Sequence, residues 1–281
     1  FVLTGSRNLS VRTTVSQSLA GRTALVSLLP FSLDEVRRAG SDLATDHLLF
    51  TGFYPRIHDR NLHPHQALSD YVGTYVERDV RQLSTVHNLS LFQKFMGLCA
   101  GRIGQLLNLE SLGNDTGVSQ PTAREWLALL EASYIAFRLP PFFANIGKRL
   151  IKTPKLYFYD VGLAAHLLGI NDVSQIARHP LRGMLFENMV IVEVMKHFLN
   201  RGPRRDLWFY RDSNGNEVDL LIPHGGSLVP VEIKSAATVA NDFFTGLQRI
   251  TTAVEQTRDP LLVYGGERAF THLGARVTGF H

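Results

Sequence analysis

The sequence has a single cysteine, Cys99, in 281 residues and contains no long apolar run. One thiol excludes an internal disulfide framework and a cysteine-rich zinc site, and it fits a reducing cytosol. No stretch approaches the roughly 18 apolar residues of a membrane-spanning helix, so we expect a cytoplasmic protein without a membrane partner. The chain also lacks an initiator Met and a signal-peptide pattern, and we expect that part of a longer protein precedes it.

A strong excess of charge of either sign is absent as well. Lys and Arg together number 29, Asp and Glu number 25, and the formal net charge is +4. This small excess permits binding to nucleic acid without predicting it, because the distribution of charge matters more than its sum. Apolar residues make up 44% and charged residues 19%, which is typical of a globular chain of two or three domains.

The pattern of apolar residues divides the chain into four regions. Residues 1–60 have a strand, helix and strand pattern, and residues 61–104 have apolar residues at helical spacing. Residues 105–177 predict two helices and then two strands. Residues 178–281 predict helix, three strands, helix and strand, so the fold class is α/β.

A short turn at 117–119 separates the two helices of the third region, and Pro121 lies near the start of the second helix. Two helices joined by such a turn, followed by two strands, indicate a winged helix. Many helical hairpins serve only in packing, so DNA contact and an interdomain packing role both stay open for this unit.

Acidic residues interrupt two apolar strands at 217–222 and 228–235. The glycine pair at 225–226 between them is suited to a two-residue turn. That turn places Asp219 opposite Glu232, and it places Glu217 opposite Lys234 by the same count. A simple cross-strand salt bridge, or a solvated strand face, is the plainer alternative.

Two facing carboxylates repel each other, and their burial is unfavourable unless a positive group lies between them. A divalent cation satisfies this condition, and ligands that are all oxygen suit Mg²⁺ or Mn²⁺. Glu187 is a third candidate ligand because it shares the apolar stripe of the helix at 181–200, whereas Glu193 lies off that stripe and is expected in solvent. The alternative for Glu187 is a buried ion pair with Arg182 or Arg211.

The order of Asp219, twelve intervening residues, Glu232, one residue and Lys234 resembles the motif of the PD-(D/E)xK nuclease fold. The resemblance implies that Asp219 and Glu232 bind metal and that Lys234 is the motif lysine. It also implies that Glu187 corresponds to a helical Glu found in several branches of that fold.

Two auxiliary positions follow from the same resemblance and from the strand register. Gln248, on a helix near 241–256, resembles an extra Gln of the RecB-like branch, although Thr252 stands where that branch has an aromatic residue. Glu217 joins the site through its predicted pairing with Lys234.

Segments along the whole chain, such as "YPRI", "YVERDVRQL", "KLYFYDVGLA" and "GMLFENMV", resemble a prokaryotic family with an AAA-type ATPase domain and a C-terminal PD-(D/E)xK-like domain. The resemblance implies the end of an ATPase domain at 1–60, a helical lid or linker at 61–104, a winged-helix-like domain at 105–177 and a restriction-endonuclease-like domain at 178–281.

The family resemblance also concerns nucleotide. It places Thr4, Ser6 and Arg22 near ATP in the full-length protein, and it suggests a homo-oligomer formed through the ATPase domain. No G-x-x-x-x-G-K-[ST] loop is present in the sequence, so ATP is expected only together with an upstream part.

The expected function is therefore Mg²⁺- or Mn²⁺-dependent hydrolysis of phosphodiester bonds in DNA. Basic residues that could track phosphates, although ordinary solvated loops would also carry them, are Lys148, Arg149, Lys152, Lys155, Arg201, Arg204 and Arg205. The alternative is a catalytically inactive nuclease fold that binds DNA or protein and regulates an ATPase. A hydrolase with a nucleophilic Ser, Cys or His has little support, because G-x-S-x-G is absent.

Overall fold

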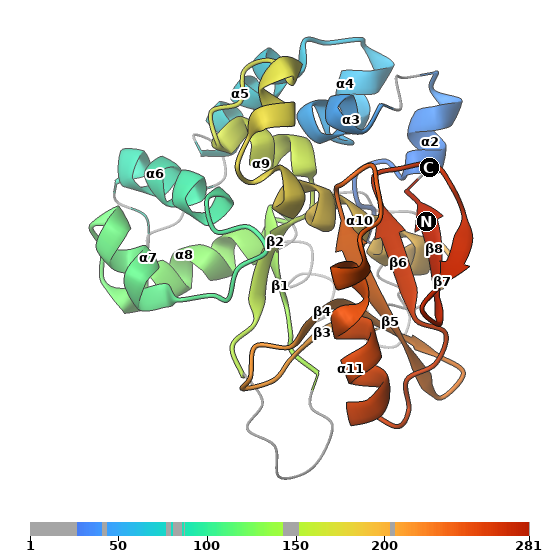
Figure 1. Cartoon of the computed structure of the whole chain (residues 1–281). Coiled ribbons are helices and arrows are strands. Elements are labelled where there is room, and N and C mark those ends of the chain that lie inside the picture. Colours follow the sequence, from blue (N-terminus) through green and yellow to red (C-terminus); the bar gives the residue numbers. More distant parts are fainter. Residues whose placement is uncertain are drawn as a thin grey trace, which may run out of the picture.

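The fold is taken from a computed structural model, which describes residues 27–40, 44–76, 80, 86, 88–142, 152–202 and 206–280. The chain is a mixed α/β structure with a six-stranded mixed sheet, a two-stranded sheet and helices (Figure 1). Thr4, Ser6 and Arg22, which were predicted near a nucleotide, lie outside the described residues.

Helices make up most of the described chain before residue 133. Their bounds are α2 Leu33–Arg38, α3 Thr45–Thr51, α4 Pro55–Asp59, α5 Pro64–Tyr75, α6 Leu89–Ala100, α7 Leu109–Thr116 and α8 Gln120–Ala132. Polar side chains determine where four of them begin, because Ser32, Asn88, Asn108 and Ser119 each accept a hydrogen bond from the backbone N–H three residues later.

Helices α7 and α8 form the predicted helical hairpin. Gly117 takes a left-handed conformation, with φ of 94°, that ends α7, and α8 begins three residues later. Two helices with a turn at 117–119 are therefore confirmed. Their contact with DNA and their assignment to a winged helix stay predictions.

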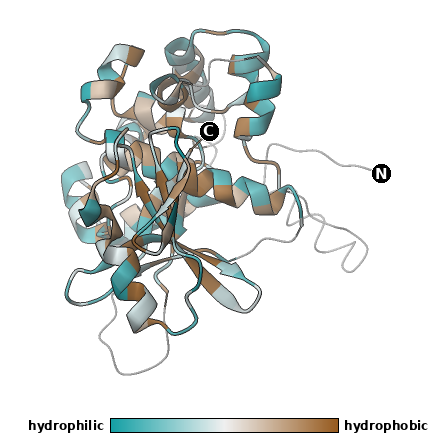
Figure 2. Ribbon diagram, turned by 45° about the vertical axis from the view of Figure 1, so that its right-hand side comes forward, coloured by the Kyte–Doolittle hydropathy of each residue, from teal (hydrophilic) through white to brown (hydrophobic). Residues whose placement is uncertain are grey.

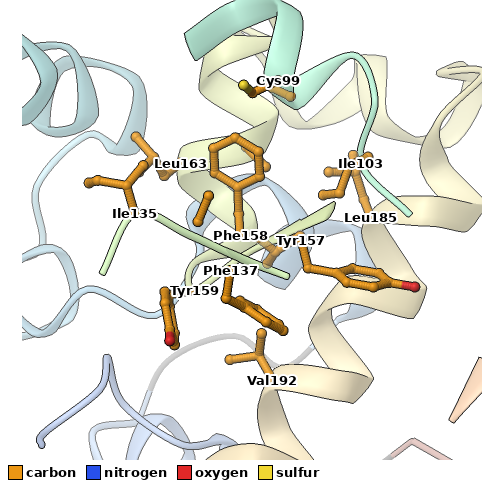
Figure 3. Packing of buried hydrophobic residues seen from close by; sticks show 14 of the residues in the cluster. Cys99, Ile103, Ile135, Phe137, Tyr157, Phe158, Tyr159, Leu163, Leu185 and Val192 are labelled. Atoms are coloured by element: carbon orange, nitrogen blue, oxygen red, sulfur yellow. The ribbon is translucent and has the colours of Figure 1, made fainter. Parts of the chain in front are cut away.

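A β-hairpin follows α8 and forms the centre of the larger apolar core. Strand β1 (Ala136–Leu139) pairs antiparallel with β2 (Lys155–Phe158), and α9 (Val161–Leu167) and the 3₁₀ helix η2 (Val173–Arg178) come next. In Figure 3, Phe158 points toward Cys99 and Leu163, and Phe137 lies beside Val192 on the other side of the hairpin. The hairpin is thus packed on both faces.

The six-stranded sheet has the order β3-β4-β5-β6-β8-β7. The elements of this part are α10 Arg182–Leu199, β3 Trp208–Arg211, β4 Glu217–His224, β5 Ser227–Lys234, η3 Asn241–Phe244, α11 Thr245–Ala253, β6 Leu261–Tyr264, β7 Phe270–His272 and β8 Ala275–Gly279. Strands β3, β4 and β5 are antiparallel, and β6 lies parallel to β5 after the α11 crossover. The predicted order of helix, three strands, helix and strand is confirmed, and β7 and β8 extend it.

Helix α10 joins the helical part to the sheet, since it contacts α3, α9 and β5 (Figure 1). One cluster of buried apolar residues extends from Leu33 on α2 to Val263 on β6. A smaller cluster packs α11 on the sheet through Leu247 and Ile250. Figure 2 shows the apolar colour concentrated on the strands and on the inner sides of the helices. Within the described ranges, none of the helices has the length and apolar character needed to span a bilayer.

Helices α3 and α9 cross at very close range beside a buried carboxylate. Asp160, which is 1% exposed, accepts hydrogen bonds from the backbone N–H of Leu163 at 2.8 Å and of Phe53 at 2.6 Å. A Cβ atom on Gly162 would lie 2.5 Å from the backbone nitrogen of Gly52. The crossing therefore has no room for a side chain at either glycine.

We predict that Gly162→Ala lowers the free energy of unfolding by roughly 1–3 kcal/mol or more, because the two backbones must separate. The matched control is Gly73→Ala, which is inside α5 with no atom within 4 Å of a new Cβ. That change should leave stability unchanged or raise it by about 0.5–1 kcal/mol. Denaturant unfolding measures both, and equal midpoints for the two variants would contradict the close crossing.

Candidate active site

The hairpin of β4 and β5 has the register that the glycine pair predicts. Gly225 and Gly226 have φ of 55° and 82°, and His224 pairs with Ser227. The pairing continues from there to Leu220 and Val231 and then stops, just before Asp219 and Glu232.

A side chain connects the two strands at the point where their backbone pairing stops. The Oδ2 atom of Asp219 accepts a hydrogen bond from the backbone N–H of Ile233 at 2.8 Å. Because this bond crosses from β4 to β5, it fixes the Asp219 carboxylate between the strands. Asp219 is 6% exposed and Glu232 is 8% exposed, so both predicted metal ligands are buried.

Lys234 links these two carboxylates. Its Nζ atom lies 2.5 Å from Oε1 of Glu232 and 3.8 Å from Oδ2 of Asp219. The other oxygen of Glu232, Oε2, is buried and has no hydrogen-bond partner in the described structure. Helix α11 begins close by, and a Cβ atom on Gly246 would lie 3.4 Å from that oxygen.

Glu187 of α10 also points into this site, and its partner is a lysine. Glu187 is 2% exposed, its Oε1 lies 3.2 Å from Nζ of Lys155, and it accepts a hydrogen bond from the hydroxyl group of Tyr157. The alternative of a buried ion pair is thus right in kind, but its predicted arginine partners are wrong. Arg182 pairs with Asp46 on α3, and Arg211 pairs with Glu217.

Glu217 lies on the outer side of the site, between two cations. Its Oε1 is 2.5 Å from Nζ of Lys155, and its Oε2 is 3.0 Å from Arg211. Arg211 of β3 is also the cross-strand partner of Glu217. Among the ion pairs of the described residues, Lys234 is bound to Glu232 and Asp219 and not to Glu217.

These side chains surround a cavity of about 300 Å³. Among the described residues that line it, the ionisable ones are Lys155, Glu187, Glu217, Asp219, Glu232 and Lys234. Four carboxylates thus face two amines. As they stand, no three Asp, Glu, His or Cys side chains in the described ranges form a group that could hold a metal ion.

The excess of carboxylate changes proton affinities in the cavity. Burial and then the Asp219 charge raise the pKa of Glu232 to about 8, and the same two causes raise the pKa of Glu187 to about 7. Burial alone would lower the pKa of Lys155, but Glu187, Asp219 and Glu217 reverse this and raise it above its usual value. The lysines are therefore charged while two carboxylates resist ionisation.

A larger cavity of about 580 Å³ lies at the turn end of the same hairpin, beside Phe142 and Trp208. It is lined by one acidic residue, Asp206, among the described residues. The smaller cavity has the converging charges that chemistry needs, so we place the candidate site there.

Several sequence predictions fall outside this site. The Lys155 side chain is 3% exposed and paired with acids, so its predicted role in tracking phosphates at the surface is wrong. Gln248 is exposed on α11 and does not line the cavity. Glu193, expected in solvent, accepts a hydrogen bond from the backbone N–H of Leu33 and is 24% exposed.

The other predicted phosphate contacts are only partly described. Lys152 and Arg201 are exposed, as a phosphate-binding residue must be. Outside the described residues lie Lys148, Arg149, Arg204 and Arg205.

Comparison with known proteins gives two family matches. Residues 43–174 match a domain of unknown function (DUF8612), and residues 182–278 match another domain of unknown function (DUF4143). Uncharacterized proteins of Mycobacterium bovis and Mycobacterium tuberculosis are each 32% identical over 271 residues. The alignment covers 96% of this chain and 59% of each relative, so the chain spans little more than half their length. No solved structure matches the chain.

The raised pKa of Glu232 predicts a specific dependence of stability on pH. The folded state holds a proton on this group up to a pKa of about 8, whereas the unfolded state releases it near 4.5. Stability in metal-free buffer must then fall as pH rises between these values. We expect Glu232→Gln to remove this loss, gaining on the order of a few kcal/mol over the wild type between pH 5 and 8.5.

The measurement is denaturant unfolding at each pH in the presence of a chelator. Glu255→Gln is the matched control, because Glu255 is exposed in the same part of the chain. Parallel curves for wild type and Glu232→Gln would show that Glu232 titrates normally in the folded protein.

Proposed function

We propose that the cavity between β4, β5 and α10 is the site of a metal-dependent phosphodiesterase of the PD-(D/E)xK type that acts on DNA. The observation that carries the proposal is the buried Oε2 of Glu232, which lacks a partner beside the carboxylate of Asp219. A buried carboxylate oxygen of this kind is costly without a positive ligand. The topology of α10, β3, β4, β5, α11 and β6 supports the same assignment.

The oxygen donors of the site have the chemistry that a hard divalent cation prefers. Asp219 and Glu232 present oxygen atoms from adjacent strands, and Glu187 adds a third carboxylate from α10. Oxygen ligands of this kind select Mg²⁺ or Mn²⁺ over softer metals. Such a cation, when bound, supplies Lewis acidity to the phosphodiester and a water molecule of lowered pKa.

Asp219 and Lys234 have different proposed roles in the reaction. Asp219 is held in place by the backbone N–H of Ile233, so its carboxylate is oriented before any ligand arrives. Lys234 is 34% exposed while its amine contacts Glu232, so it can reach both the ligands and an incoming phosphate. We propose that it donates hydrogen bonds to the attacking water or to the developing charge on the phosphate.

Other parts of the chain are proposed to deliver the substrate. Exposed Lys152 and Arg201 carry positive charge that phosphates can contact. The hairpin of α7 and α8 is the proposed winged-helix element for DNA. In a full-length protein, with an upstream ATPase part, this site would be coupled to ATP and to assembly through that part.

One observation favours the alternative of an inactive module that binds DNA or protein and regulates an ATPase. Lys234 already contacts Glu232, and Lys155 contacts Glu187 and Glu217. Amines can stabilise this cluster without a cation, and such a cluster would hold the fold together without chemistry.

A nuclease assay separates the two proposals. Linear, nicked, branched and single-stranded DNA are incubated with the purified chain in Mg²⁺ or Mn²⁺. We expect cleavage by the wild type and a loss of at least ~100-fold in Asp219→Asn and Glu232→Gln, while Glu255→Gln keeps full activity. Cleavage that persists in Asp219→Asn, or no cleavage by the wild type on any substrate, would contradict the catalytic proposal.

A further inference from the structure

The cavity is built from two parts of the chain that match different families. Glu187, Glu217, Asp219 and Glu232 belong to the region at 182–278, whereas Lys155 belongs to the region at 43–174. Strand β2 thus inserts a buried amine among four carboxylates that all come from the downstream region. Figure 1 shows the hairpin of β1 and β2 lying between the helices and β3 and β4.

The backbone around Lys155 is held at both edges of β2 and by α10. One edge of β2 pairs with β1, and the other edge meets Leu106 through a bridge to Lys155 itself. Asn188 of α10 binds the backbone of Phe158 through two hydrogen bonds, of 2.7 Å and 2.9 Å. The contacts of the whole β1–β2 hairpin therefore keep Lys155 beside α10.

The amine of Lys155 occupies oxygen atoms that a divalent cation would need. Its Nζ atom lies 3.2 Å from Glu187, one of the three proposed ligands, and 2.5 Å from Glu217. A divalent cation bound by Glu187 would share this carboxylate with a fixed positive charge, and the two cations would repel each other in a buried site.

We propose that Lys155 is an internal counter-ion through which the upstream region controls the binding of Mg²⁺ or Mn²⁺ in the cavity. The inference rests on the proposed function, because it requires that the cavity binds such a cation. Competition between the two cations is reciprocal. A bound divalent cation must weaken the ion pair between Lys155 and Glu187 of α10. Tight packing of β2 against α10 must in turn weaken cation binding.

Calorimetric titration with Mn²⁺ tests the proposal without any assay of activity. We expect Lys155→Met to bind Mn²⁺ at least ~10-fold more tightly than the wild type, because its competing charge is gone. Lys155→Arg keeps the charge and should stay within about threefold of the wild type. Equal or weaker binding by Lys155→Met would overturn the proposal.

Two matched controls separate competition in the cavity from a general change in charge. Arg211→Met removes a cation from the outer oxygen of Glu217, and Arg211 does not line the cavity. Lys152→Met removes an exposed cation three residues before Lys155. Both should bind Mn²⁺ within about threefold of the wild type, because solvent screens the exposed charge of Lys152 and because Arg211 contacts Glu217, which is not one of the three proposed ligands. An increase in either control equal to that of Lys155→Met would overturn the proposal.

Loss of Lys155 leaves Glu187 without a cation and Glu217 with Arg211 alone, so folding is checked by circular dichroism and thermal unfolding. If Lys155→Met does not fold, the double variant Lys155→Met with Glu217→Gln replaces it, since it removes one of the two acids that Lys155 contacted and keeps Glu187. The same tighter binding is expected, and its absence overturns the proposal.

The pattern of results also distinguishes the two proposals. Wild-type binding that Asp219→Asn abolishes and Lys155→Met leaves unchanged would overturn the counter-ion role alone. No Mn²⁺ binding by the wild type or by any folded variant would overturn the proposed metal site and the counter-ion role together.

Discussion

The burial of three carboxylates, with a fourth at the edge of the same cavity, beside two amines is the constraint on which the arrangement of this protein depends. Glu187 comes from α10, whereas Asp219 and Glu232 come from β4 and β5, and none of them is stable in the interior without positive charge nearby. Lys234 provides part of that charge from within the hairpin. Lys155 provides the rest from β2, so the electrostatics of the cavity tie the hairpin of β1 and β2 to α10 and to the sheet.

Hydrogen bonds beside the cavity strengthen the same connection. The side chain of Asn188, next to Glu187, binds both backbone groups of Phe158, and the hydroxyl group of Tyr157 binds Glu187. Apolar packing continues on both sides of the contact between β2 and α10, because a single cluster includes residues of α2, β2, α10 and β6. The two regions that match different families are thus joined through one core, and a ligand that alters the charge of the cavity acts directly on their interface.

The sequence predicts the local features well and the distant pairings poorly. Two glycines between alternating strands determine the register of β4 and β5, which is why the neighbourhood of Asp219 and Glu232 could be foreseen. The position of Glu187 followed from helical spacing. The partner of Glu187 could not be predicted in this way, because Lys155 lies 32 residues earlier in a basic segment. A periodic pattern does not indicate which strand faces α10. The exposed position of Gln248 was missed because a family likeness, not a physical pattern, had placed it in the site.

Anomalous diffraction from crystals soaked in Mn²⁺ tests most directly whether the carboxylate excess is a cation site. We expect an anomalous peak within coordination distance of Asp219 and Glu232, with the amine of Lys234 displaced from Glu232. Absence of a peak there, with Lys234 still bound to Glu232 at saturating Mn²⁺, would contradict a cation site in the cavity and leave the lysines as the permanent partners of these carboxylates.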